Sequence, residues 1–285
     1  MKIKNYSNLV VFSHTIFAMP FALIGYTYGL MTTNATFNWC ILIQVVLCMI
    51  FARKTAMGFN RWADREIDAK NPRTAQREIP AGKITPKAAL TFTIANAILF
   101  TITAATINPL TAILSPVALV VITAYSYCKR FTSLAHIVLG LSLAIAPVGA
   151  YIAVAGKFAF LPCLLAIVVM TWCSGFDIIY ALQDRDFDIE NGLKSIPSKF
   201  SVKGALAISS ALHVTSAATL IYIALQLPEN IYKWIGIAIF IALLIMQHLL
   251  VTPTKQRNIG IAFGTTNGVA SVILAIFIII NLIVG

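Results

Sequence analysis

Residues 86–128 read PKAALTFTIANAILFTITAATINPLTAILSPVALVVITAYSYC and contain two apolar runs, 86–106 and 109–128. Each run has the ~20 residues that an α-helix needs to cross the hydrocarbon core of a bilayer. Only the segment INP, residues 107–109, separates the runs, and its proline cannot continue the first helix. The stretch therefore predicts two membrane-spanning helices that form a tight antiparallel hairpin.

Apolar runs fill most of the 285-residue chain, which is 59% hydrophobic and 11% charged, with a mean hydropathy of +0.86. A soluble domain carries roughly 25% charged residues. Residues 1–285 are therefore predicted to form a single all-α membrane domain, with nine transmembrane helices in one bundle around a central cavity. The N-terminal run, residues 8–31, is too long for the ~7–15-residue core of a signal peptide and is expected to be a membrane span. The other runs are 39–59, 134–155, 158–181, 203–227, 231–252 and 262–284.

The distribution of basic residues predicts the orientation of these helices, because lysine and arginine concentrate in cytoplasmic loops. With the N-terminus in the cytoplasm, all of the 21 lysines and arginines except Lys157 and Lys233 lie in cytoplasmic segments or at adjoining helix ends. This bias and attraction to anionic membrane lipid explain the net charge of +11, and no nucleic-acid partner is expected. The predicted cytoplasmic segments are 1–7, 60–85, 129–133, 182–202 and 253–261.

Acidic residues are concentrated still more strongly. All ten except Glu229 lie in, or at the edge of, two of these loops, and the orientation rule says little about aspartate and glutamate. The two loops also resemble each other, since DREIDAKN at 64–71 aligns with DRDFDIEN at 184–191. Each copy follows an even-numbered span. The pattern therefore predicts two pseudo-repeated halves that meet around one site.

Three oxygen-bearing residues of the first loop, Asn60, Asp64 and Asp68, are spaced four residues apart. A helix that continues past the membrane surface aligns them on one face. Like charges repel at this spacing unless a cation lies between them, and hard oxygen ligands suit Mg²⁺. Pro72 is expected to end this helix near Asn71.

The second loop repeats the arrangement, with Asp177, Tyr180, Asp184 and Asp188 on one helical face. Asp177 lies at the inner end of an apolar span, where a carboxylate is costly and indicates function. The predicted Mg²⁺ ligands of the two clusters are Asn60, Asp64, Asp68, Asp184 and Asp188. Mg²⁺ completes its coordination with water and substrate phosphates, so nearby cations are candidates for binding a diphosphate: Arg73, Arg77, Lys129, Arg130 and Lys194.

The two loops carry longer patterns as well. Residues 60–82 follow NRxxDxxxDxxNxRTxxRxxxxG, and residues 177–195 follow DxxYAxxDxxxDxxxGxxS. These patterns resemble the paired signatures of the UbiA superfamily of intramembrane aromatic prenyltransferases. YSYCKRFT at 125–132 resembles the family's short basic loop after the fourth span, and the likeness covers essentially the whole chain.

Within the superfamily, AKNPRTAQREIPAG at 69–82 and YALQDRDFDIENGLKSIP at 180–197 look most like the 4-hydroxybenzoate polyprenyltransferase group. This group includes relatives in the futalosine route to menaquinone. Arg61 departs from the first signature of the family, because many members carry an acidic residue at this position, directly after the asparagine that corresponds to Asn60.

The resemblance implies a multi-pass enzyme of the inner (cell) membrane with its active site facing the cytoplasm. It implies Mg²⁺-dependent transfer of a polyprenyl group from polyprenyl diphosphate to an aromatic acid in ubiquinone or menaquinone biosynthesis. The acceptor is then of the 4-hydroxybenzoate or dihydroxynaphthoate type. Its ring would attack the allylic cation left when the diphosphate departs. The candidate catalytic residues are Asp64, Asp68, Asp177, Asp184 and Asp188.

Further residues are candidates for contact with the acceptor or the allylic cation. Arg130 and Lys129 could hold the acceptor carboxylate, and Asp177 could assist positioning or deprotonation. His14 and Asn267 could face the site from the first and last spans, or simply join helices. Four aromatic residues could stabilise the cation with a ring face or serve in packing: Tyr125, Tyr180, Phe176 and Trp62. The remaining histidines show no partner spacing and are interpreted as structural: His136, His213 and His248.

Alternative functions are open at this point. A divalent-cation transporter would need ionisable residues near the midplane of its spans, whereas these carboxylates lie at the predicted cytoplasmic ends. A phosphatidyl-alcohol synthase also uses Mg²⁺ and aspartates, but its compact DGxxAR element is absent from this sequence. Within the superfamily, homogentisate, haem, chlorophyll and glycerol-phosphate acceptors fit less well.

Overall fold

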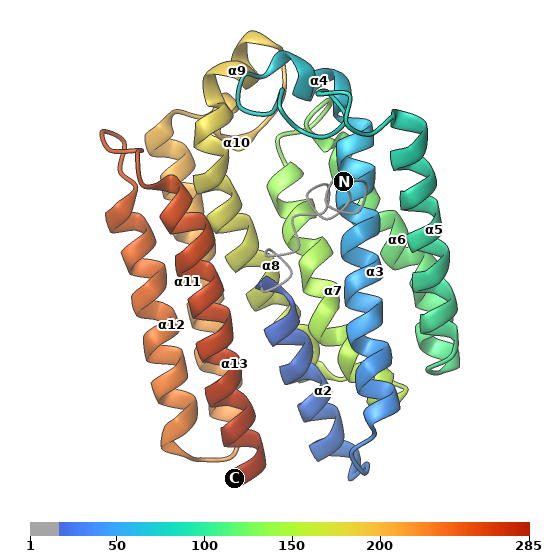
Figure 1. Ribbon diagram of the computed structural model, residues 1–285. Helices are drawn as coiled ribbons and strands as arrows, with labels where there is room; N and C mark the ends of the chain where they lie inside the picture. Colours follow the sequence, from blue (N-terminus) through green and yellow to red (C-terminus); the bar gives the residue numbers. More distant parts are fainter. Residues whose placement is uncertain (1–16) are drawn as a thin grey trace.

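The computed structural model describes residues 17–285, whose regular structure is helical apart from an isolated bridge between Thr252 and Lys255. The long helices run side by side in one bundle, and short helices gather at one end of it (Figure 1). The long helices are α2 (Met19–Thr33), α3 (Trp39–Ala63), α5 (Pro86–Ala105), α6 (Pro109–Cys128), α7 (Ala135–Ala155), α8 (Phe160–Ala181), α11 (Val202–Gln226), α12 (Ile231–Leu250) and α13 (Thr266–Val284). The short helices at the end are α4 (Arg65–Lys70), α9 (Arg185–Glu190) and α10 (Ile196–Lys199).

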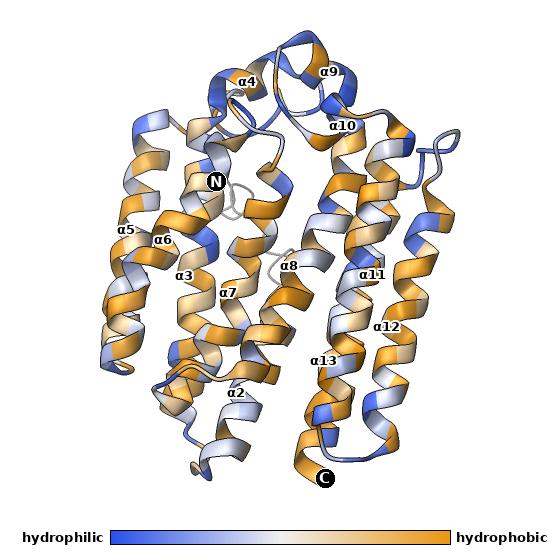
Figure 2. Cartoon of the chain, turned by 180° about the vertical axis from the view of Figure 1, so that it is seen from behind, coloured by the Kyte–Doolittle hydropathy of each residue, from blue (hydrophilic) through white to orange (hydrophobic). Residues whose placement is uncertain are grey.

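Eight helices in the described part of the chain are long and apolar enough to cross a membrane. Figure 2 shows that these helices consist mostly of hydrophobic residues and that hydrophilic residues gather at the end of the bundle around α4 and α9. The all-α membrane fold is therefore confirmed. The expected first span, 8–31, begins before residue 17, so nine spans and a cytoplasmic N-terminus stay predictions.

The hairpin expected at residues 107–109 joins α5 to α6. Asn108 begins α6 by accepting a hydrogen bond from the Thr111 backbone N–H at 3.0 Å. The Asn108 side chain also donates to the Ile152 carbonyl at 2.9 Å, near the end of α7. Because a bilayer offers no water to backbone groups, such side-chain bonds are needed where a helix ends. The short turn is thus tied to the neighbouring helix.

The contact between α7 and α8 is close because it is made at a glycine. A Cβ at Gly140 would collide with the Met170 carbonyl oxygen and the Ser174 hydroxyl of α8. Small residues of this kind let two membrane helices approach closely. On the other side of α8, Trp172 is fully buried in a core that also contains residues of α11, α12 and α13.

We predict that Gly140→Ala destabilises the protein, because an added methyl group must push α7 away from α8. Overpacking of this kind costs roughly 1–3 kcal/mol. The matched control is Gly149→Ala in the same helix, where nothing lies within 4 Å of the added Cβ. Thermal unfolding in detergent should show a lower midpoint for Gly140→Ala alone. Equal midpoints would contradict the close approach.

Candidate active site

The first acidic cluster lies where α3 meets α4. Asp64 separates the two helices, yet the hydrogen bonds continue through it: its N–H donates to the Asn60 carbonyl at 2.9 Å, and its carbonyl accepts from Asp68 at 2.7 Å. The three side chains therefore keep helical spacing, as predicted. Asn71 ends α4 in an extended conformation directly before Pro72, which confirms the expected end of this helix.

The second cluster has a similar local structure. α8 ends at Ala181, a 3₁₀ turn covers Leu182–Asp184, and α9 begins at Arg185. α4 and α9 thus occupy residues 65–70 and 185–190, the same places in the two aligned segments. This recurrence is local, and the relation of two whole halves stays a prediction.

Burial separates the predicted ligands from the other acids of the loops. Asp68, Asp184 and Asp188 are 5%, 8% and 1% exposed. The side chains of Glu66 and Asp186, which also lie in α4 and α9, are 80% and 88% exposed. The aspartates on the predicted faces therefore point into the protein, and their neighbours point to solvent.

Each of four inward carboxylates is paired with one of the predicted diphosphate-binding cations. Paired charges are far less costly to bury than single ones. In every pair the cation side chain is the more exposed partner. The nitrogen–oxygen distances are 3.0 Å for Arg130–Asp64, 2.6 Å for Arg77–Asp68, 2.5 Å for Arg73–Asp184 and 3.4 Å for Lys129–Asp188.

Residues of the first loop contact the second cluster directly. Asn71 donates to Asp184 Oδ1 at 3.0 Å, and the Arg73 guanidinium contacts both oxygens of the same carboxylate. Arg73 also donates to the Tyr180 hydroxyl at 3.1 Å. Lys129, from the short loop after α6, reaches Asp188. The two sequence-distant clusters are therefore parts of one polar site.

The side-chain oxygens at this site have the chemistry that suits a hard divalent cation, although in residues 17–285, with the carboxylates paired to cations, no three acidic, histidine or cysteine side chains are grouped closely enough to hold one. Asp68 Oδ2 is buried and has no hydrogen-bond partner among residues 17–285. Burial raises the pKa of the Asp64 carboxyl above its ordinary value, although the charge of Arg130 opposes the effect. A cation beside these oxygens would favour the ionised form. Carboxylate and amide oxygens are also the ligands that suit Mg²⁺.

Other predicted site residues have different surroundings. Lys194 donates to the Phe131 carbonyl at 3.3 Å and contacts no carboxylate. Asn267 is fully buried between α8, α12 and α13, where its Oδ1 accepts from Trp172 and Gln247 at 2.9 and 2.8 Å. These contacts join helices, which is the second of the two roles considered for Asn267. His14 lies outside the described residues.

The candidate aromatic residues divide into two groups. Phe176 is 3% exposed in the apolar core, and the Trp62 ring packs in a small cluster with Ile79. Both are packing residues. Tyr180 lies beside the acid clusters, with its ring against Phe263 at 4.1 Å between centroids, and Tyr125 lines a cavity.

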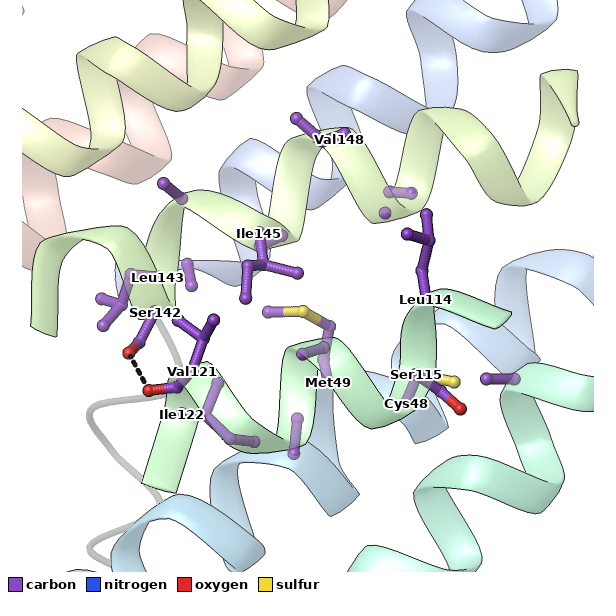
Figure 3. Close-up of a pocket in the computed structure, with 18 of the residues that line it drawn as sticks. Cys48, Met49, Leu114, Ser115, Val121, Ile122, Ser142, Leu143, Ile145 and Val148 are labelled. Atoms are coloured by element: carbon purple, nitrogen blue, oxygen red, sulfur yellow. Dashed lines mark hydrogen bonds between the residues drawn. The ribbon is translucent and has the colours of Figure 1, made fainter. Parts of the chain in front are cut away.

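This cavity of about 410 Å³ lies between α3, α6 and α7 (Figure 3). The close-up shows an almost wholly apolar lining with residues such as Met49, Ile122 and Ile145. Its polar lining residues are Arg53, Tyr125 and three with aliphatic hydroxyls, Thr111, Ser115 and Ser142; among all the lining residues only Arg53 carries a charge. Arg53 Nε is buried without a hydrogen-bond partner in the described structure. One residue beyond Tyr125, Ser126 accepts from Asn60 at 3.5 Å, so the cavity ends close to the first acidic cluster.

Sequence reasoning missed partners that only the packing of helices reveals. His136 was interpreted as structural, but its Nδ1 lies 2.6 Å from Asp177 Oδ2. His213 and His248 are partners of each other at 2.9 Å. Arg53 was counted only as an orientation charge, although a charged residue inside an apolar run is itself a sign of function.

The chain is a bundle of apolar helices long enough to cross a membrane, with two acid clusters joined into one polar site at its end. This combination is typical of enzymes embedded in membranes. Comparison with known proteins identifies the member of that class. Residues 18–274 match the UbiA prenyltransferase family, and the chain belongs to this family. It is a prenyltransferase.

Curated relatives are similar over most of their length. A 4-hydroxybenzoate octaprenyltransferase from Aliivibrio fischeri (strain MJ11) is 33% identical over 83% of this chain and 82% of its own. One from Vibrio parahaemolyticus is 29% identical over 85% of each chain.

Solved structures share the fold. The apo structure of a UbiA homolog from Aeropyrum pernix K1 is 29% identical, with a TM-score of 0.78 over 95% of this chain and 97% of that one. A UbiA homolog from Archaeoglobus fulgidus bound to GPP and Mg²⁺ is 20% identical, with a TM-score of 0.77 over 98% and 99% of the two chains.

We predict that Asp68→Asn and Asp184→Asn each weaken binding of a divalent cation by about 10-fold or more, since each removes a buried anionic oxygen. Binding of Mn²⁺, as a spectroscopic substitute, can be followed by electron paramagnetic resonance. Glu66→Gln and Asp186→Asn, which remove exposed acids from the same helices, should bind as the unmodified protein does. Equal weakening in all four variants would mean that the effect is one of overall charge.

Proposed function

We propose that the protein transfers a polyprenyl group from a polyprenyl diphosphate to 4-hydroxybenzoate, at the cytoplasmic face of the inner membrane, in ubiquinone biosynthesis. One observation supports this most strongly: the two acid clusters, interleaved with four cations, form one polar site. An apolar cavity ends close to the first of these clusters, and it is lined by Arg53, which makes no ion pair with any described residue. The names of the curated relatives favour 4-hydroxybenzoate. A dihydroxynaphthoate acid of the menaquinone route has the same carboxylate and is the second candidate.

The diphosphate group binds at the cation side of the polar site. Arg73 and Arg77 present planar forks that match phosphate oxygens, whereas Lys129 acts as a point charge. Because these side chains are more exposed than their acidic partners, an incoming phosphate meets the cations first. Mg²⁺, when held by Asn60, Asp64, Asp68, Asp184 and Asp188, supplies positive charge that stabilises the departing diphosphate.

The acceptor carboxylate binds to Arg53. Arg130, the earlier candidate, is occupied by Asp64 and by the backbone carbonyls of Ser126 and Ala63. Arg53 makes no ion pair within the described residues and lines the cavity. Arg53 is half-buried and its Nε is fully buried, and such a cation is costly unless it meets an anion. An aromatic acid supplies both the anion and an apolar ring that suits the cavity wall.

Tyr125 is better placed than Tyr180 to stabilise the allylic cation. The Tyr180 ring already has Phe263 against it and the Arg73 guanidinium 5.5 Å from its centroid. Tyr125 instead lines the cavity at its polar end. An aromatic ring attracts a cation to its face, and no nucleophilic side chain is needed when the acceptor ring itself attacks.

We expect purified enzyme with labelled prenyl diphosphate and Mg²⁺ to form a prenylated product with 4-hydroxybenzoate. A panel that also contains dihydroxynaphthoate, homogentisate and glycerol phosphate, read by product mass, identifies the acceptor class. Product with glycerol phosphate alone would contradict an aromatic acceptor.

We predict that Arg53→Leu raises the KM for 4-hydroxybenzoate by about 10-fold or more, because a hydrogen bond to a charged group contributes roughly 1.5–3 kcal/mol. The KM for the neutral analogue 4-hydroxybenzamide should change little. Lys54→Leu is the matched control, since Lys54 is the next cation and does not line the cavity. Equal effects on the acid and the amide would exclude a carboxylate contact.

A further inference from the structure

A histidine and a carboxylate form a close pair between α7 and α8. His136 Nδ1 lies 2.6 Å from Asp177 Oδ2. His136 is in the first turn of α7, shortly after the loop that supplies Lys129 and Arg130 to the acid clusters. The pair therefore lies near the polar site but takes no part in its four ion pairs.

The packing of the two helices holds this pair rigidly. Gly140 lets α7 approach α8 closely, as described above. The Ser174 hydroxyl donates to the backbone carbonyl of His136 at 3.1 Å, one turn before Asp177 on α8. Both side chains thus project from regular helices with fixed backbones, which is the arrangement that gives a site its precision.

The two members of the pair differ in burial, and only one of them is accessible from outside the protein. The His136 side chain is 1% exposed, whereas the Asp177 side chain is 18% exposed. The residues on both sides of Asp177, Phe176 and Ile178, are 3% and 0% exposed. His136 holds Asp177 Oδ2, no hydrogen bond joins Oδ1 to another described residue, and the carboxylate side chain is partly exposed.

The position of Asp177 on α8 directs it to the polar site. Tyr180, one turn further along α8, bonds to Arg73, which in turn holds Asp184. Residues 177, 180 and 184 share one face of the helix. Asp177 therefore lies on the same helical face as Tyr180 and Asp184, about two helical turns deeper in the bundle than Asp184.

We propose that Asp177 is the proton acceptor of the transfer reaction and that His136 is the residue that positions it. The inference rests on the proposed function. In the reaction, the bond between prenyl C1 and the diphosphate oxygen breaks, and a bond forms between C1 and a ring carbon of the acceptor. That carbon must then lose its proton. Asp177 Oδ1 takes the proton, the C–H electron pair returns to the ring, and aromaticity is restored.

His136 acts through Asp177 and touches no substrate. With Nδ1–H donated to Oδ2, the imidazole fixes the carboxylate orientation, as a positioning group does behind a general base. A pair that only joined helices would have both partners buried and satisfied. Here His136 Nε2 is buried without a partner in the described structure, and the Asp177 side chain is partly exposed.

The test compares ring-deuterated with ordinary 4-hydroxybenzoate. In the unmodified enzyme the proton leaves quickly after the carbon–carbon bond forms, so the rates should be equal. Asp177→Asn and His136→Leu should lower kcat by about 100-fold or more, the usual range for general base catalysis, and the deuterated acceptor should then react more slowly. Prenyl diphosphate binding should be unchanged.

Two further variants separate positioning from structure. His136→Asn places an amide N–H where Nδ1 was and should restore most of the rate that His136→Leu loses. Thr171→Ala removes a buried hydroxyl of α8 that bonds only to the Ile167 and Val168 carbonyls of the same helix, so its kcat and its rates with both acceptors should match those of the unmodified enzyme.

Transfer by Asp177→Asn at the normal rate, or slow transfer with no isotope effect, would overturn the proposal. If His136→Leu fails to fold, the rates and isotope effects of Asp177→Asn and His136→Asn test the two proposed roles without it. Failure of the unmodified enzyme to prenylate any aromatic acid would instead refute the proposed function.

Discussion

Mutual repulsion among carboxylates at one end of a membrane bundle is the constraint on which the polar site depends. Asp68, Asp184 and Asp188 are almost fully buried, where charges interact more strongly than in water. Each is paired with a cation: Asp68 with Arg77 of its own loop, and Asp184 and Asp188 with cations from other loops. The pairs Arg73–Asp184 and Lys129–Asp188 join loops that are far apart in the sequence, so neutralising the acids also assembles the site.

The sequence predicted much of this because the membrane leaves few choices. A bilayer admits only helices or closed barrels, and runs of about 20 apolar residues then locate the helices to within a few residues. The acidic clusters followed from helical spacing alone, since Asn60, Asp64 and Asp68 keep one face through a change of helix at Asp64. Local rules were sufficient for these features.

Features that depend on which helices touch were not predictable. The partner of His136 is 41 residues away, and it is reached only because Gly140 brings α7 against α8. Asn267 was ambiguous because a polar residue in a span can bind a ligand or a neighbouring helix. The side-chain N–H groups of Trp172 and Gln247 both donate to Asn267, which shows contacts between helices. These partners lie on other helices, so residue spacing within one helix could not have predicted them.

The connection between cavity and polar site is made within single helices. On α6, Tyr125 lines the cavity and the next residue, Ser126, bonds to Asn60. On α3, Arg53 lies in the cavity two turns before Asn60. Helical backbones fix such separations far better than loops do. α3 and α6 thus fix the distance between the proposed acceptor site in the cavity and the first acid cluster, so that the alignment of the acceptor with this cluster follows from the fold itself.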